Sequence, residues 1–207
     1  MKLLEDIVEA ATDDKVPIGN LLRKCLVLER QLKNENFRTW LNLELDGYDR
    51  DKETEFPDYR VFNCVNKGDF LGMVVKLSDQ PISLHHMDEH DRKLLHIVHL
   101  HQPAAAYEAR PNKDHDASLP WNPTITAKYQ RKIYQGGDPA LIRAWQEIPG
   151  SILVGLLEQV RTRVLRFALE LQENLPKDSV DATAVPPDLV ETSVINTIFG
   201  GKKIDWT

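Results

Sequence analysis

Residues 148–174 read IPGSILVGLLEQVRTRVLRFALELQEN, and their apolar side chains recur every three or four positions. This spacing predicts a long amphipathic helix, because about 3.6 residues per turn bring such positions onto one face. Pro149 suits the first turn, where its missing N–H is no loss, and Gly155 predicts a close backbone contact. We expect the domain to pack on this helix. The apolar stripe consists of Leu153, Leu157, Val160, Val164, Phe167 and Leu171.

The composition is that of an ordinary globular protein, since 42% of the 207 residues are hydrophobic and 28% are charged. A formal net charge of −6 argues against general nucleic-acid binding, which uses a basic surface to displace counterions. The N-terminus lacks the apolar core of a signal peptide. The longest apolar run, Ile152–Leu157, is six residues, against about 20 for a membrane span. We therefore expect a soluble, cytoplasmic protein with no membrane span.

The N-terminal third shows helical periodicity and then changes to the period of a strand. Gly47 is placed to end the third helix in the left-handed conformation. After Pro57 the period becomes two, which predicts strands over 59–65 and 70–77 with a hairpin turn at Asn66–Asp69. The predicted helices span residues 2–12, 17–32 and 35–45, and their short connections favour antiparallel packing.

The remaining elements complete an α+β fold: an N-terminal three-helix unit, a small, mostly antiparallel sheet, the long C-terminal helix and a terminal hairpin. Residues 94–100 form an apolar segment of helix or strand, 112–123 a loop, and 141–148 an extended segment. Short helices are expected over 103–110 and 124–135. We expect one domain over 1–175, a linker over 176–188 and a β-hairpin tail over 189–207.

The tail is distinct in composition, because residues 189–199 are rich in β-formers and Gly200-Gly201 permits a tight turn. A lone two-stranded hairpin is marginal in water, so this one needs a partner. The partner is the chain's own domain, a second copy of the chain, or another molecule. The residues expected to make this contact are Val194, Ile198, Phe199, Ile204 and Trp206.

The histidine-rich segment contains His86-Met87-Asp88-Glu89-His90, which matches the H-x-x-E-H pattern of inverted zinc peptidases. That motif belongs in a buried helix, whereas this segment is polar and suggests no third ligand. We read it as a solvated segment and predict no metal site and no cofactor. Lys128, Arg131 and Lys132 form a basic helix face that would suit a phosphate or RNA, although a solvated face explains it more simply.

Catalytic motifs are otherwise lacking in the sequence, which has no Gly-rich phosphate loop, nucleophile elbow or C-x-x-C pair. Glu108, at the end of a predicted short helix, is a weak candidate for a catalytic carboxylate. The pattern therefore leans away from an enzyme.

Several segments together resemble the N-terminal module of AbiTii-like abortive-infection proteins. They are the start of the chain (LLEDIVEA), then WLNLELDGY, FPDYRVFN, the long helix from IPGSIL onward, and VINTIFGG. The resemblance extends from Leu3 to Gly201 and is looser over residues 83–137. Its motif residues have mainly structural interpretations, as caps, buried rings and chain redirection. They are Gly47, Tyr48, Pro57, Asp58, Tyr59, Arg60 and Pro149.

The resemblance implies a role in bacterial defence against phage, in which infection triggers growth arrest or death. Our first hypothesis is a non-enzymatic sensing and association module that oligomerises or docks a defence effector. The alternative is a toxin nuclease that acts on cellular RNA or DNA. Its pocket would collect Glu108, a histidine from His96–His101 and a base from Lys128–Lys132.

Overall fold

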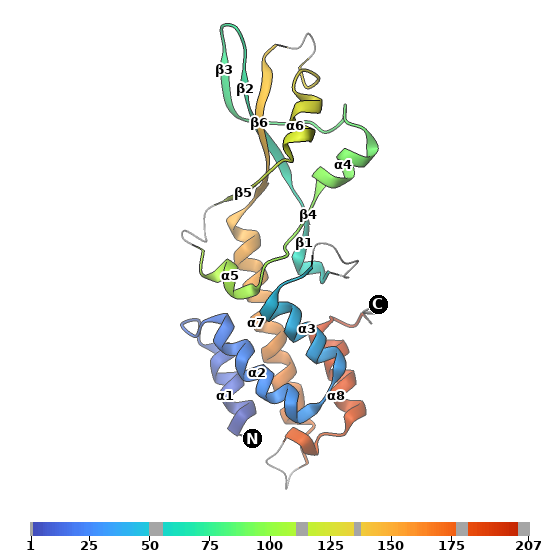
Figure 1. The fold of residues 1–207 in the computed structure, drawn as a ribbon. Coiled ribbons are helices and arrows are strands. Elements are labelled where there is room, and N and C mark those ends of the chain that lie inside the picture. The colour runs from blue at the N-terminus through green and yellow to red at the C-terminus, as the bar shows by residue number, and fades with distance from the viewer. Residues whose placement is uncertain (1, 50–55, 111–115, 135–137, 177–181, 203–207) are drawn as a thin grey trace. The chain divides into compact units, whose positions relative to one another are not determined.

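A computed structural model describes residues 2–49, 56–110, 116–134, 138–176 and 182–202 (Figure 1). The chain divides into two compact units. Unit 1 comprises Met1–Tyr59, His101–Lys113 and Val154–Thr207, and unit 2 comprises Arg60–Leu100 and Asp114–Leu153. Within the described residues, no helix is long and apolar enough to cross a membrane.

The three N-terminal helices of unit 1 are confirmed as α1 (Lys2–Thr12), α2 (Ile18–Leu32) and α3 (Glu35–Asp46). Each packs on the next through apolar stripes, with α2 in contact with both neighbours. Gly47 ends α3 with a φ of 94°. A Cβ at this position would lie 2.8 Å from the carbonyl oxygen of His101, so only glycine fits.

The long helix is confirmed as α7 (Gly150–Glu173), with Pro149 immediately before its first residue. Its stripe is buried, and from Leu157 onward it belongs to unit 1, where the ring centroids of Phe37 and Phe167 lie 4.6 Å apart. The close contact expected at Gly155 is wrong, because a Cβ there would meet no described atom within 4 Å.

The prediction of a C-terminal β-hairpin is also wrong, because this part of unit 1 is helical. A 3-10 turn (Ala182–Ala184, η2) leads to α8 (Pro187–Ser193) and to a π-helical turn (Val194–Ile198, η3). Val190, Val194 and Ile198 are β-formers, but they recur four residues apart and therefore also form a helical stripe, which is buried. Phe199 is buried as well. Ile204, Trp206 and the return strand expected after Lys202 lie outside the described residues.

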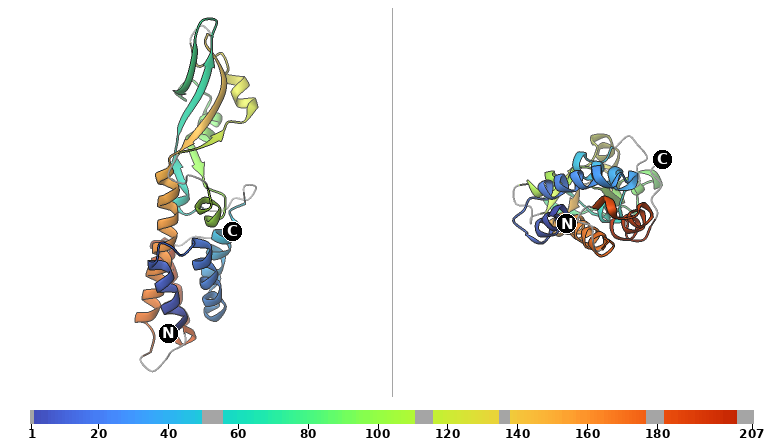
Figure 2. Two further views of the ribbon diagram at one scale, coloured as in Figure 1. Left: turned by 90° about the vertical axis from the view of Figure 1, so that its left-hand side faces the viewer. Right: turned by 90° about the horizontal axis from the view of Figure 1, so that it is seen from below.

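Unit 2 is built on a four-stranded antiparallel sheet of order β3-β2-β6-β5. Its strands are β2 (Val65–Leu71), β3 (Lys76–Pro81), β5 (Ala117–Pro120) and β6 (Ala140–Ile148). A second pair joins β1 (Val61–Asn63) to β4 (Ile97–His99), after the 3-10 turn Asp58–Arg60 (η1). Figure 2 shows the long strands side by side, with α6 (Pro123–Tyr129) beside β6.

The hairpin turn expected at Asn66–Asp69 is wrong, because these residues lie inside β2 and the chain turns at residues 72–75. Two of these residues, although typical of turns, make contacts in the interior of unit 2. Asn66 is buried and accepts a hydrogen bond from Trp121, and Gly68 leaves room for Leu141, whose Cδ1 would lie 2.7 Å from an added Cβ.

The core of unit 2 lies between the sheet and the helices α4 (Glu89–His96) and α6. The segment 94–100, left open between helix and strand, is both, since it ends α4 and forms β4. The short helix expected over 103–110 is α5 (Ala104–Glu108) of unit 1. The buried core residues of unit 2 are Phe70, Ile82, Met87, Leu95, Trp121, Tyr129, Leu141 and Ala144.

Candidate functional site

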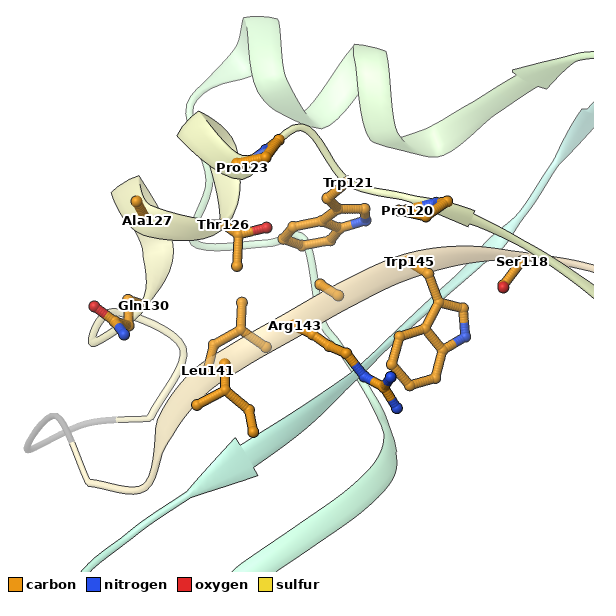
Figure 3. A pocket seen from close by; sticks show the side chains of 12 residues that line it. Ser118, Pro120, Trp121, Pro123, Thr126, Ala127, Gln130, Leu141, Arg143 and Trp145 are labelled. Atoms are coloured by element: carbon orange, nitrogen blue, oxygen red, sulfur yellow. The ribbon is translucent and has the colours of Figure 1, made fainter.

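A pocket of about 640 Å³ lies in unit 2 beside β6 (Figure 3). Its walls come from β5 and the residue after it, from α6, and from the first half of β6. The residues that line it are Ser118, Pro120, Trp121, Pro123, Thr126, Ala127, Gln130, Leu141, Ile142, Arg143, Ala144 and Trp145.

The pocket lies where β5 ends and α6 follows it as the neighbour of β6. Strand β5 ends at Pro120, and the N–H of Trp121 makes a last bond of 2.9 Å to the carbonyl of Ala144. Asn122 then begins α6, its side chain accepting the N–H of Thr124 at 2.9 Å. The Trp121 indole is fixed by its 2.8 Å bond to the buried Asn66. The wall of the pocket is therefore preorganised.

A β-bulge shapes the β6 side of the pocket. Asp69 pairs with Arg143 and Phe70 with Leu141, so Ile142 is an extra residue without a partner on β2. Ile142 remains 47% exposed as a result. The bulge therefore presents an aliphatic side chain and a guanidinium side by side at the pocket.

Arg143 is held by an ion pair and by an aromatic ring. Its guanidinium lies 2.6 Å from Asp69 and 5.5 Å from the ring centroid of Trp145. A hydrogen bond from the Asp79 N–H, with help from Arg143, holds the pKa of the Asp69 carboxyl below its usual range. Asp69 is therefore charged near neutral pH and keeps Arg143 in place.

A second charged cluster joins α4 to α6. Lys128 forms ion pairs with Asp88 and with Asp91, the latter at 2.7 Å, and Tyr129 donates a hydrogen bond to Asp88 at 3.0 Å. The hydrogen bond from Lys128 is the main cause that lowers the pKa of Asp88, and the hydrogen bond from the Asp91 N–H is the second. The carboxylates of Asp88 and Asp91 in turn raise the pKa of Lys128. These groups have local partners, and their arrangement fastens two helices.

The described side chains of the lining are mostly apolar. Among the described residues of the lining, Arg143 is the one ionisable side chain, and it is paired with Asp69. General acid–base catalysis needs a group that exchanges protons near neutral pH, which an arginine does not do. The lining otherwise offers aromatic and aliphatic surface with a few neutral polar groups.

The candidate Glu108 lies in unit 1, where it has a structural contact. Both of its carboxylate oxygens accept the N–H of Ile18, the first residue of α2, and Arg161 lies 4.0 Å away. Of the histidines in the hypothetical nuclease set, His101 lies in unit 1 with Glu108, whereas His96 and His99 lie in unit 2 with the bases from Lys128 to Lys132. The members of the set are therefore divided between the two units.

The motif residues around Tyr59 form a hydrogen-bonded network in unit 1. Buried Glu44 accepts from the hydroxyl of Tyr48 at 2.9 Å and from that of Tyr59 at 2.8 Å. Trp40 donates to the Tyr59 oxygen at 2.8 Å, and the guanidinium of Arg163 lies 4.8 Å from the Tyr59 ring centroid. Glu44 was not singled out from the sequence, although its position on the apolar stripe of α3 marks it as buried.

The neighbouring motif residues also make packing and backbone contacts. Pro57 is buried before the 3-10 turn, and Asp58 forms an ion pair of 2.6 Å with Lys202 of unit 1. In unit 2, buried Arg60 donates to the carbonyl of Leu100 at 2.6 Å. No group of three or more metal-ligating side chains occurs within the described ranges, including the segment from His86 to His90.

The structure is that of an α+β protein with a mostly apolar pocket in unit 2. The chain belongs to the AbiTii family, whose model matches residues 2–195. No curated protein and no solved structure matches the chain. Membership in this family implies a part in abortive-infection phage defence.

Proposed function

We propose that the protein acts in abortive infection as a non-enzymatic sensing and association module. The pocket of unit 2 docks an apolar side chain of a partner protein. The observation that carries this proposal is the lining itself, in which aromatic and aliphatic groups surround one arginine that is already ion-paired.

The lining has the composition of an interaction hot spot. Tryptophan and arginine are enriched among the residues that dominate binding energy, and both occur here as Trp145 and Arg143. Trp121 is held by its hydrogen bond to buried Asn66, so this ring loses little side-chain freedom on binding. Arg143 is oriented by its ion pair with Asp69, although its side chain is 72% exposed. The side chain of Ile142 lines the pocket and is 47% exposed, so it adds accessible apolar surface to the site.

The charge of the site also favours a protein over a nucleic acid. Binding to a phosphate backbone is driven by cations that displace counterions. The described part of the lining supplies one cation, whose carboxylate partner Asp69 would repel phosphate. Neutral Gln130 and Ser118 are suited instead to the amide groups of a peptide.

The test compares phage plating on cells that produce Ile142→Asp with plating on cells that produce the matched control Leu94→Asp. Leu94 is 54% exposed on α4 of the same unit and does not line the pocket. We expect Ile142→Asp to lose protection and Leu94→Asp to keep it, at equal soluble amounts. Full protection by Ile142→Asp would contradict the proposal.

Light scattering on the same variants identifies the kind of partner. If the unaltered chain has the mass of an oligomer and Ile142→Asp that of one chain, the partner is a second copy. If both have the mass of one chain, the pocket docks a different protein.

A further inference from the structure

The turn between β2 and β3 carries an unusual apolar surface, which we call the hairpin tip (residues 71–75). Met73 is 94% exposed and Val74 97% exposed, and Leu71 and Val75 are exposed as well. Single exposed apolar residues are normal, but a contiguous group marks an interaction site. The intervening Gly72 adds no polar side chain, so the tip is apolar throughout.

Three cations, Lys76, Arg131 and Lys132, lie at the same end of unit 2, and we call them the basic flank. Leu71 pairs with Lys76 across the hairpin. Figure 1 shows the turn after α6, which contains Arg131 and Lys132, at the end of the sheet where the hairpin turns. That turn is held to the sheet by a 2.8 Å bond from the Leu141 N–H to the Gln130 carbonyl.

The basic flank is positive although the whole chain carries −6. None of its three side chains forms an ion pair with a described residue. Asp138 is the acidic group at the tip, where a Cβ on Gly72 would lie 2.8 Å from its Oδ1. Lys132 also contacts the ring of Tyr129, whose centroid lies 5.5 Å from its ammonium, and Lys76 helps to lower the pKa of the ion-paired Asp69. The three cations therefore keep their charge without a salt bridge to a described carboxylate.

We propose that the hairpin tip docks on an anionic lipid surface. Exposed apolar side chains at a projecting turn enter the boundary between headgroups and acyl chains, and the adjacent cations bind anionic headgroups. A protein would have to offer a concave apolar receptor, and such a receptor would not require the basic flank. The combination of an apolar tip and cations therefore favours lipid.

Addition of a partner strand to the outer strand β3 is a weaker explanation of this surface. Strand β3 ends in Pro81, its pairing with β2 shifts register after Gly68, and Asp79 has a φ of 57°. These features obstruct pairing along an edge. The tip is also separate in sequence from the pocket, so this proposal does not depend on the proposed function.

The test is flotation of the full chain with vesicles of phosphatidylcholine alone or of phosphatidylcholine with phosphatidylglycerol. We expect binding to the anionic vesicles and a loss of about tenfold or more in Met73→Ser/Val74→Ser, because both side chains are free to insert. Arg131→Gln/Lys132→Gln should weaken binding by roughly fivefold per charge removed. Val27→Ser, an exposed apolar position on α2, is the control and should bind normally.

The proposal would be overturned by no binding to anionic vesicles, by unchanged binding of Met73→Ser/Val74→Ser, or by equal binding to both kinds of vesicle. Loss of phage protection by the Met73→Ser/Val74→Ser variant, without vesicle binding by the unaltered chain, would assign the tip to a protein and also overturn it. Trp145→Ala should float normally even if it loses protection. The two proposals can therefore fail separately.

Discussion

Both carboxylate oxygens of Glu108 accept the backbone N–H of Ile18, at distances of 3.1 and 2.9 Å. Pro17, which precedes α2, provides no side-chain cap, so a residue far along the chain supplies it. An anionic cap suits the positive end of the helix dipole. The contact gives Glu108, the weak candidate for a catalytic carboxylate, a structural role.

Replacement of Glu108 should therefore affect stability. We expect Glu108→Ala to lower the free energy of unfolding by about 1 kcal/mol, the typical value of a lost helix cap. Urea denaturation of the full chain measures the change. A variant as stable as the unaltered chain would mean that the contact contributes nothing to the fold.

The C-terminal segment should behave as part of the core of unit 1. Ile198 is fully buried, and Ile198→Ala should cost about 2–5 kcal/mol through lost burial and a cavity. Leu189→Ala, at an exposed position of α8, is the matched control and should change stability little. If removal of residues 189–207 left the thermal midpoint unchanged, the segment would be a detachable tail after all.

Gly155 offers a stabilising substitution in the middle of α7. Glycine costs a helix interior about 1 kcal/mol relative to alanine, and a methyl group here would meet no described atom within 4 Å. Gly155→Ala should raise the unfolding free energy by up to about 1 kcal/mol. A loss of stability in the same denaturation assay would reveal a contact that the free space at Gly155 does not suggest.

The ion pairs of Lys128 predict how stability depends on pH. Lys128 lowers the pKa of Asp88 in the folded protein. The ionised Asp88 therefore stabilises the fold above the pKa it has in the unfolded chain, about 3.9, and this stabilisation is lost as the pH falls below that value. The pKa of Lys128 is raised in the folded protein. Charged Lys128 therefore stabilises the fold below the pKa it has in the unfolded chain, about 10.4, and this stabilisation is lost at higher pH. Asp88→Asn should flatten the acid limb of a stability profile measured by denaturation. An unchanged acid limb would show that the pair does not fasten α4 to α6.

Helices with one apolar stripe could be predicted from the sequence, because their period depends on local spacing alone. The failures have specific causes. Val190, Val194 and Ile198 satisfy both a strand preference and a helical spacing, and the burial of that stripe in unit 1 decides between them. Asn66 and Gly68 look like turn residues, yet contacts with Trp121 and Leu141 place them in a strand.

The candidate site was harder to predict than the helices. Its residues come from separate segments, and none belongs to a recognisable motif. Strand β5, which forms one wall, was expected to be a loop because its sequence is polar and ends in proline. Local patterns therefore did not show that Trp121 and Trp145 would line one pocket.

Phage plating on cells that produce Trp145→Ala or Glu108→Gln, side by side, tests most directly whether the protein acts by association or by catalysis. Trp145 lines the pocket, whereas Glu108 is the candidate catalytic residue and caps α2. At equal soluble amounts, we predict that Trp145→Ala loses protection and Glu108→Gln retains it. Retention by Trp145→Ala together with loss by Glu108→Gln would contradict the account.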